Sequence, residues 1–170
     1  MDKPSLTVGT VSLLDRVLTA TADAVTTVVV GPERVTCLPV LWTREEPIGA
    51  GPVAALSAGL ELITAHTLVV LAADLPFLTA EVVEHLVASI AADGAVLVDA
   101  EGREQFLCSA WRTAALRRAD LTVDRLSLVV GALEVTSVWV PPSPGLPAPW
   151  TDCDTDSDLQ TARAWAEEDR

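Results

Sequence analysis

The sequence predicts a three-layer α/β/α domain with a mainly parallel sheet. Short runs rich in β-branched residues lie at 26–31, 67–72 and 95–99, and they are apolar on both faces, as in parallel strands covered by helices. Segments with helical spacing of apolar residues separate these runs, and such alternation is typical of a layered α/β domain. The chain has 170 residues, which suits one domain, so we expect residues 1–170 to form a single unit.

The elements follow in order along the chain. Helices are predicted over 11–24, 52–64 and 80–92, each with a periodic apolar face, and Pro52 stands at the favoured first helical position. The Pro-rich stretch 141–149 is predicted to be a loop, because proline cannot donate to a central ladder.

The last helix is expected to open at Thr155. Asp158 follows three residues later, which makes a variant of the capping box.

Composition excludes several functional classes. The formal net charge of −13 argues against nucleic acid, and no apolar run reaches the roughly 18 residues of a membrane span. The N-terminus has no apolar segment of a secretory signal. Cys37, Cys108 and Cys153 are odd in number and far apart, so they predict neither a disulfide framework nor a CxxC metal pair. Cys37 and Cys108 lie in strand-like runs and are expected in the core, and the protein is expected in the cytoplasm.

One carboxylate stands where ligands of α/β sheets bind, beyond the carboxyl end of a strand. In LVVLAADLPFLT the apolar run ends at Asp74, and Leu75-Pro76 breaks the strand. A cation such as Mg²⁺ takes one or two carboxylates together with substrate phosphate oxygens. The alternative is that Asp74 caps a turn, and spacing alone weights the two interpretations equally.

A second acidic cluster, TDCDTDSD, precedes the last helix. Asp156 and Asp158 fall in its first turn, where the helix dipole favours them. Of Asp152 and Asp154, one is expected to cap the helix and the other to share a cation with Asp74. A purely structural role for all four is slightly favoured by spacing alone.

Two loops could hold substrate. In TREEPIGAGPVAAL, Gly49, Gly51 and Pro52 lead into a helix whose free N–H groups suit an anion or a nucleotide edge; a flexible connection is the simpler interpretation. In DAEGREQFL, Arg103 could hold an anionic group, although such charged clusters are more often solvated loops.

Taken in order, DKPSL, REEPIGAGPVAAL, LAADLPFLT, GREQFL and DCDTDSDL resemble the successive motifs of the molybdenum cofactor guanylyltransferase (MobA) family. That family belongs to the nucleotidyltransferases of glycosyltransferase-A-like fold. The resemblance implies a Rossmann-like nucleotidyltransferase domain that transfers GMP from Mg-GTP to the phosphate of molybdopterin and releases pyrophosphate. It implies Mg²⁺ as cofactor. It also implies GTP, molybdopterin or molybdenum cofactor, and molybdoenzyme maturation proteins as partners, without nucleic acid or membrane.

The resemblance also assigns roles by position. The implied catalytic residues are Lys3 and Asp74. The implied nucleotide-binding residues are Lys3, Glu45, Glu46, Gly51, Pro52 and Asp74; the implied metal ligands are Asp74, Asp154 and, less directly, Asp152; the implied acceptor-binding residues are Arg103 and Gln105.

The chain departs from the family pattern in two places. Phe106 stands where relatives have proline, and Met1 falls inside a motif that follows a strand and a Gly-rich loop in the family. We therefore expect an N-terminally incomplete form, with two strand edges unpaired and little activity alone. The alternatives are a degenerate non-catalytic nucleotide-binding or regulatory relative, the same chemistry with another base such as CTP, or a rearranged sheet in which residues 5–8 supply the first strand.

Overall fold

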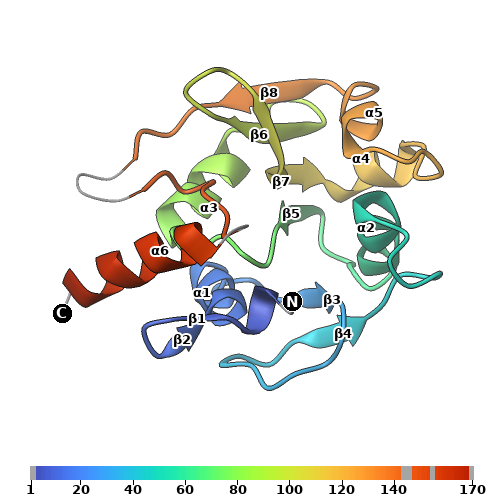
Figure 1. Cartoon of the computed structure of the whole chain (residues 1–170). Helices are drawn as coiled ribbons and strands as arrows, with labels where there is room; N and C mark the ends of the chain where they lie inside the picture. The colour runs from blue at the N-terminus through green and yellow to red at the C-terminus, as the bar shows by residue number, and fades with distance from the viewer. Residues whose placement is uncertain (1–2, 143–146, 154–155, 169–170) are drawn as a thin grey trace.

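The computed structural model describes residues 3–142, 147–153 and 156–168. Its elements, in chain order, are η1 (Lys3–Ser5), β1 (Thr7–Val8), β2 (Val11–Ser12), α1 (Leu13–Ala20), β3 (Val28–Val30), β4 (Leu41–Thr43), α2 (Pro52–Leu60), β5 (Thr67–Leu71), α3 (Ala80–Ala88), β6 (Gly94–Val98), β7 (Glu104–Arg112), α4 (Thr113–Arg118), α5 (Leu126–Val130), β8 (Val135–Val138) and α6 (Asp156–Glu168) (Figure 1). In the described part of the chain, no helix is long and apolar enough to cross a membrane.

The largest sheet has the order β5-β7-β6-β8. β6 and β8 are parallel, whereas β7 runs antiparallel to both β5 and β6. The α/β class is confirmed, but this sheet is mixed where a mainly parallel one was predicted. The reason is local: only residues 99–103 join β6 to β7, and so short a connection joins antiparallel strands.

Two smaller ladders lie outside this sheet. β3 and β4 form a parallel pair, and β1 and β2 form an antiparallel hairpin. Among the described residues, β3 and β5 each have one edge without a ladder partner. The alternative in which residues 5–8 supply a strand to the main sheet is wrong, because Thr7 and Val8 pair with Ser12 and Val11 across a turn containing Gly9, at φ +64°.

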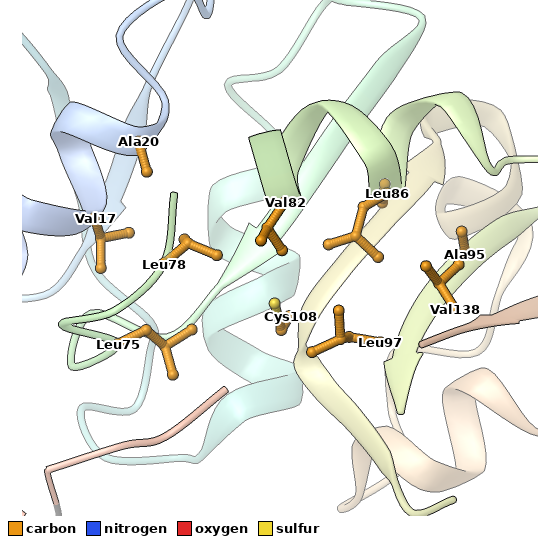
Figure 2. Packing of buried hydrophobic residues seen from close by; sticks show 11 residues of the cluster. Val17, Ala20, Leu75, Leu78, Val82, Leu86, Ala95, Leu97, Cys108 and Val138 are labelled. Carbon is orange, nitrogen blue, oxygen red and sulfur yellow. The ribbon is translucent and has the colours of Figure 1, made fainter. Parts of the chain in front are cut away.

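Apolar clusters cover both faces of the four-stranded sheet. On one face, Val82 and Leu86 of α3 pack with Ala95 and Leu97 of β6 and with Cys108 of β7 (Figure 2). The alternate residue of β6, Val96, joins α2, α4 and α5 in the cluster on the other face. The three predicted layers are therefore present around this sheet.

The predicted elements are recovered with shorter bounds. The apolar runs at 26–31, 67–72 and 95–99 contain β3, β5 and β6, and the periodic segments contain α1, α2 and α3. A polar cap shortens α1 at its start: Ser12 Oγ accepts the Asp15 N–H at 3.0 Å, so α1 begins later than its pattern does.

Further along, the described parts of 141–149 contain no strand, as predicted. α6 begins at Asp156, and Thr155, where we expected it to open, lies outside the described residues.

The cysteine prediction holds for one of two residues. Cys108 is buried in β7, as expected, whereas Cys37 is exposed in the irregular segment between β3 and β4. Cys37 N–H donates to Asp15 Oδ1 at 2.8 Å, so this cysteine ties the segment to α1 and contributes nothing to the core.

Candidate functional site

Three strands end at the same edge of the four-stranded sheet. β5 and β6 are both antiparallel to β7 and so run the same way, and β8 is parallel to β6. Asp74 lies half-buried in the turn after β5, and Asp99 directly follows β6. Residues 147–153 follow β8. Two strand spacings separate the ends of β5 and β6, which is about 10 Å.

A cavity of about 650 Å³ lies beside Asp99 at this edge. The loop 99–105 lines one side and residues 150–152 line the other, so the cavity brings together the predicted site residues Arg103, Gln105 and Asp152. Its volume falls within the usual range for small-molecule sites. Asp74 is not among the lining residues, so the predicted pairing of Asp74 with Asp152 is not part of this cavity.

The carboxylate of Asp99 accepts hydrogen bonds from several residues of the 99–105 loop. Only 6% of this residue is exposed. Its Oδ1 accepts the N–H groups of Glu101 and Arg103 at 3.0 and 2.8 Å. Its Oδ2 accepts Arg103 Nε–H at 2.9 Å and Gln105 Nε2–H at 3.3 Å. The bond from the Arg103 N–H, above all, holds the pKa of Asp99 below its ordinary value, against the opposing effect of desolvation.

Arg103 is held from two sides. Its Nη2 donates to Glu101 Oε2 at 2.9 Å, in addition to the Nε bond to Asp99. The hydrogen bond to Glu101 and, next, the hydrogen bond to Asp99 raise the pKa of Arg103, and the negative charges of both carboxylates add to the effect. Because its charge is already compensated twice, Arg103 is a weaker anion site than a solvated arginine.

A bulge in β7 places this loop. The register between β6 and β7 jumps after Val96, which pairs with Ser109, to Leu97, which pairs with Gln105. The extra residues of the bulge are 106–108. Ser109 Oγ donates to the Phe106 carbonyl at 2.8 Å, and this hydrogen bond spans the bulge. Such bulges re-aim side chains beside functional sites. Here the bulge brings Gln105 alongside the end of β6.

The predicted nucleotide loop follows β4. Glu45 Oε1 accepts the Gly49 N–H at 2.9 Å, and this bond holds the pKa of Glu45 below its ordinary value. Gly51 has φ +96°, a conformation that favours glycine, and it precedes Pro52 at the start of α2. Within the described part of the chain, the N-cap residue makes no side-chain hydrogen bond to this helix start, whose first N–H groups have no partner inside the helix. Glu46 is exposed.

The structure leaves the other predicted residues less defined. Lys3 lies in η1 with its side chain outside the described part, and Asp154 is also outside. Among the residues that the structure describes, no three acidic, histidine or cysteine side chains gather as a metal site.

Asp99 is the residue that sequence reasoning missed as a site candidate. The signal was present, because AVLVD repeats the pattern that singled out Asp74, an apolar strand followed by aspartate. What the sequence did not show is the turn that folds Arg103 and Gln105 back onto this carboxylate.

Comparison with known proteins supplies the family. The model of the MobA-like NTP transferase domain matches residues 1–134. A molybdenum cofactor guanylyltransferase from Rhodobacter capsulatus is 34% identical over 128 residues, which are 74% of this chain and 65% of that protein. The chain thus spans a little under two thirds of that relative.

Solved structures confirm the fold. A molybdopterin-guanine dinucleotide biosynthesis protein A from Archaeoglobus fulgidus superposes with a TM-score of 0.75 at 21% identity, over 99% of this chain and 92% of that one. A 2-C-methyl-D-erythritol 4-phosphate cytidylyltransferase from Thermus thermophilus gives 0.75 at 22% identity, over 97% and 93%. With the domain model matching most of its length, this chain belongs to the family of MobA-like NTP transferase domains.

Proposed function

We propose that this protein transfers GMP from Mg-GTP to the terminal phosphate of molybdopterin, forming molybdopterin guanine dinucleotide and releasing pyrophosphate. The observation that supports this best is the common sheet edge. It carries Asp74 after β5 and, two strands away, a cavity walled by Arg103 and Gln105. A nucleotide at the first position and an acceptor at the second would lie close enough to react.

In this proposal the nucleotide lies against the 43–52 loop and Asp74. The uncapped N–H groups at the start of α2 suit an anion or a base edge, and Gly51 allows a close approach of the backbone. Glu45 shapes the loop through Gly49, and Glu46 is exposed beside it. Lys3 is the proposed cationic partner of the triphosphate.

The donor chemistry fits Mg²⁺. Asp74 and Asp152 offer carboxylate oxygens, the ligands that this cation prefers, and Asp154 is the third proposed ligand. When bound, Mg²⁺ supplies charge neutralisation of the phosphates. A chain of net charge −13 that binds two anionic substrates needs such a cation.

The protein's own part is to position the reactants. The acceptor phosphate is already a nucleophile and pyrophosphate is a stable leaving group, so neither needs a protein base. Catalysis of this kind is mostly orientation and electrostatics. The fixed loop around Asp99 would orient the acceptor, and Asp74 with the α2 start would orient the nucleotide.

A second candidate is the same chemistry with CTP. The Thermus cytidylyltransferase superposes as well as the Archaeoglobus protein does, each with a TM-score of 0.75. The fold therefore does not favour guanine over cytosine.

The test is a transfer assay with α-labelled GTP, CTP, ATP and UTP, each with Mg²⁺ and molybdopterin. We expect label in the pterin product from GTP, at a low rate, and none with the Asp74→Asn variant. If only CTP gives labelled product, the proposed substrate changes from GTP to CTP. If no nucleotide is transferred from any of the four triphosphates while calorimetry still shows Mg-GTP binding, the proposed enzymatic activity is refuted. That result would support a non-catalytic nucleotide-binding relative.

A further inference from the structure

We propose that Asp99 is a positioning residue of the acceptor site, which presets Arg103 and Gln105 before substrate arrives. The inference rests on the proposed transfer function and adds to it a residue that acts through Arg103 and Gln105. Its basis is the set of four bonds that converge on one buried carboxylate in the cavity wall.

The two carboxylate oxygens of Asp99 accept hydrogen bonds from different kinds of donor. Among the described residues, Oδ1 accepts the backbone N–H groups of Glu101 and Arg103 and so fixes the turn. Oδ2 accepts side-chain N–H groups of Arg103 and Gln105, and so holds two of the residues that line the cavity. Because the two roles lie on separate atoms, one substitution can remove the second while keeping the first.

Without Asp99 the two lining residues would be loosely held. The Arg103 side chain is 73% exposed, so its rotamers are restricted mainly by its bonds to Asp99 and Glu101. Those bonds use Nε and Nη2, and within the described structure Nη1 is left for a ligand. Gln105 Nε2 donates to Asp99 Oδ2 and, at 3.5 Å, to the Arg103 carbonyl; these bonds fix which way its amide faces and leave Oε1 as an acceptor.

The preset pair therefore offers one oriented donor and one oriented acceptor. Asp99 and Glu101 compensate the charge of Arg103, and Glu104 adds further negative charge to the lining. This balance favours the uncharged polar ring of the acceptor over its phosphate. Restricting such side chains in advance lowers the entropic cost of binding.

The same strand supplies a matched control at its other end. Asp93, directly before β6, accepts Arg118 Nη2 at 2.9 Å and the Glu134 N–H at 3.0 Å. It thus makes the same kinds of bond as Asp99, to an arginine side chain and to backbone, but far from the cavity. Replacing it tests what the loss of such bonds does to the fold alone.

The experiment compares Asp99→Asn with Asp93→Asn in the transfer assay. The amide of Asp99→Asn keeps Oδ1 for the backbone N–H groups but turns an NH₂ donor toward Arg103 Nε and Gln105 Nε2. We expect the KM for molybdopterin to rise about tenfold or more, as for a lost charge-assisted bond. The KM for GTP should stay within about twofold. Asp93→Asn should lower the melting temperature and leave both KM values unchanged.

A second readout does not depend on activity. The ¹⁵N-labelled Arg103 Nε–H should exchange slowly with solvent in the wild type and in Asp93→Asn, and quickly in Asp99→Asn. Equal effects of the two variants on the acceptor KM, or none from Asp99→Asn in an active enzyme, would overturn the positioning role alone. A wild type that transfers no nucleotide would overturn the proposed function and the acceptor role with it, whatever the Arg103 signal shows.

Discussion

Gly94 is the position where one added methyl group should disturb the core most. A Cβ built on Gly94 would lie 2.7 Å from Trp111 Cζ3 and 2.9 Å from the Ala110 carbonyl oxygen, and closer still to Trp111 Cε3. Real Cβ contacts essentially never fall below 3.0 Å, so the indole has to shift. Trp111 is 2% exposed, and its Nε1 donates to Ser109 Oγ at 2.8 Å, which leaves little room for that shift.

We therefore expect Gly94→Ala to lower the free energy of unfolding by about 2–3 kcal/mol, at the upper end of overpacking effects. For a chain of this size, that is a fall in melting temperature of about 4–12 °C. Thermal and urea unfolding by circular dichroism measure it. In the Trp111→Phe background, which removes the crowded ring atoms, Gly94→Ala should cost at least about 1 kcal/mol less. Equal costs in the two backgrounds would refute the steric explanation.

Three further outcomes are expected. Asp74→Asn should keep the melting temperature and lose Mg²⁺-dependent GTP binding by calorimetry; unchanged affinity would remove Asp74 from the site. The pKa of Asp99 is lowered on folding, so its contribution to stability is present above its ordinary pKa of 3.8 and is lost as pH falls through the lower folded value. We therefore measure the free energy of unfolding by urea at several pH values between 2 and 6. This free energy should change less steeply with pH in Asp99→Asn than in the wild type, and equal steepness in the two proteins would contradict the prediction. Burial raises the pKa of Cys108 to about 12 and Cys37 is exposed, so iodoacetamide at pH 8 should label Cys37 and spare Cys108 in the folded protein, as mass spectrometry of peptides can check.

The sequence predicted those features that depend on local pattern. Apolar runs predicted β3, β5 and β6, and Pro52 marked the start of α2, because strand propensity and helix caps act over a few residues. The prediction that Arg103 and Gln105 share a site is consistent with the cavity that both line.

The features that escaped prediction depend on how neighbouring strands pair. The antiparallel course of β7 follows from the short 99–103 connection, and its bulge follows from how Val96 and Leu97 pair with residues 105–109, which no periodicity reports. The importance of Asp99 arises from that same pairing. Cys37 was expected in the core because its neighbours are apolar, yet its segment lies on the surface and is held by Asp15.

The separation of the β3–β4 ladder from the larger sheet has a mechanical consequence. In the described structure no backbone ladder joins the two; α2 bridges them, with Gly59 against Val30 on one side and Leu56 packed in the same cluster as Leu68 on the other. Side-chain packing resists sliding less than a hydrogen-bonded ladder, so we expect the two sheets to shear against each other more readily than either sheet deforms. In such a motion the 43–52 loop would follow the smaller ladder and the 99–105 loop the larger sheet. Two substrates bound across both loops would then link the smaller ladder to the larger sheet. Hydrogen exchange of the backbone amides in β3 should therefore slow when both substrates are bound, while exchange in β6 stays unchanged.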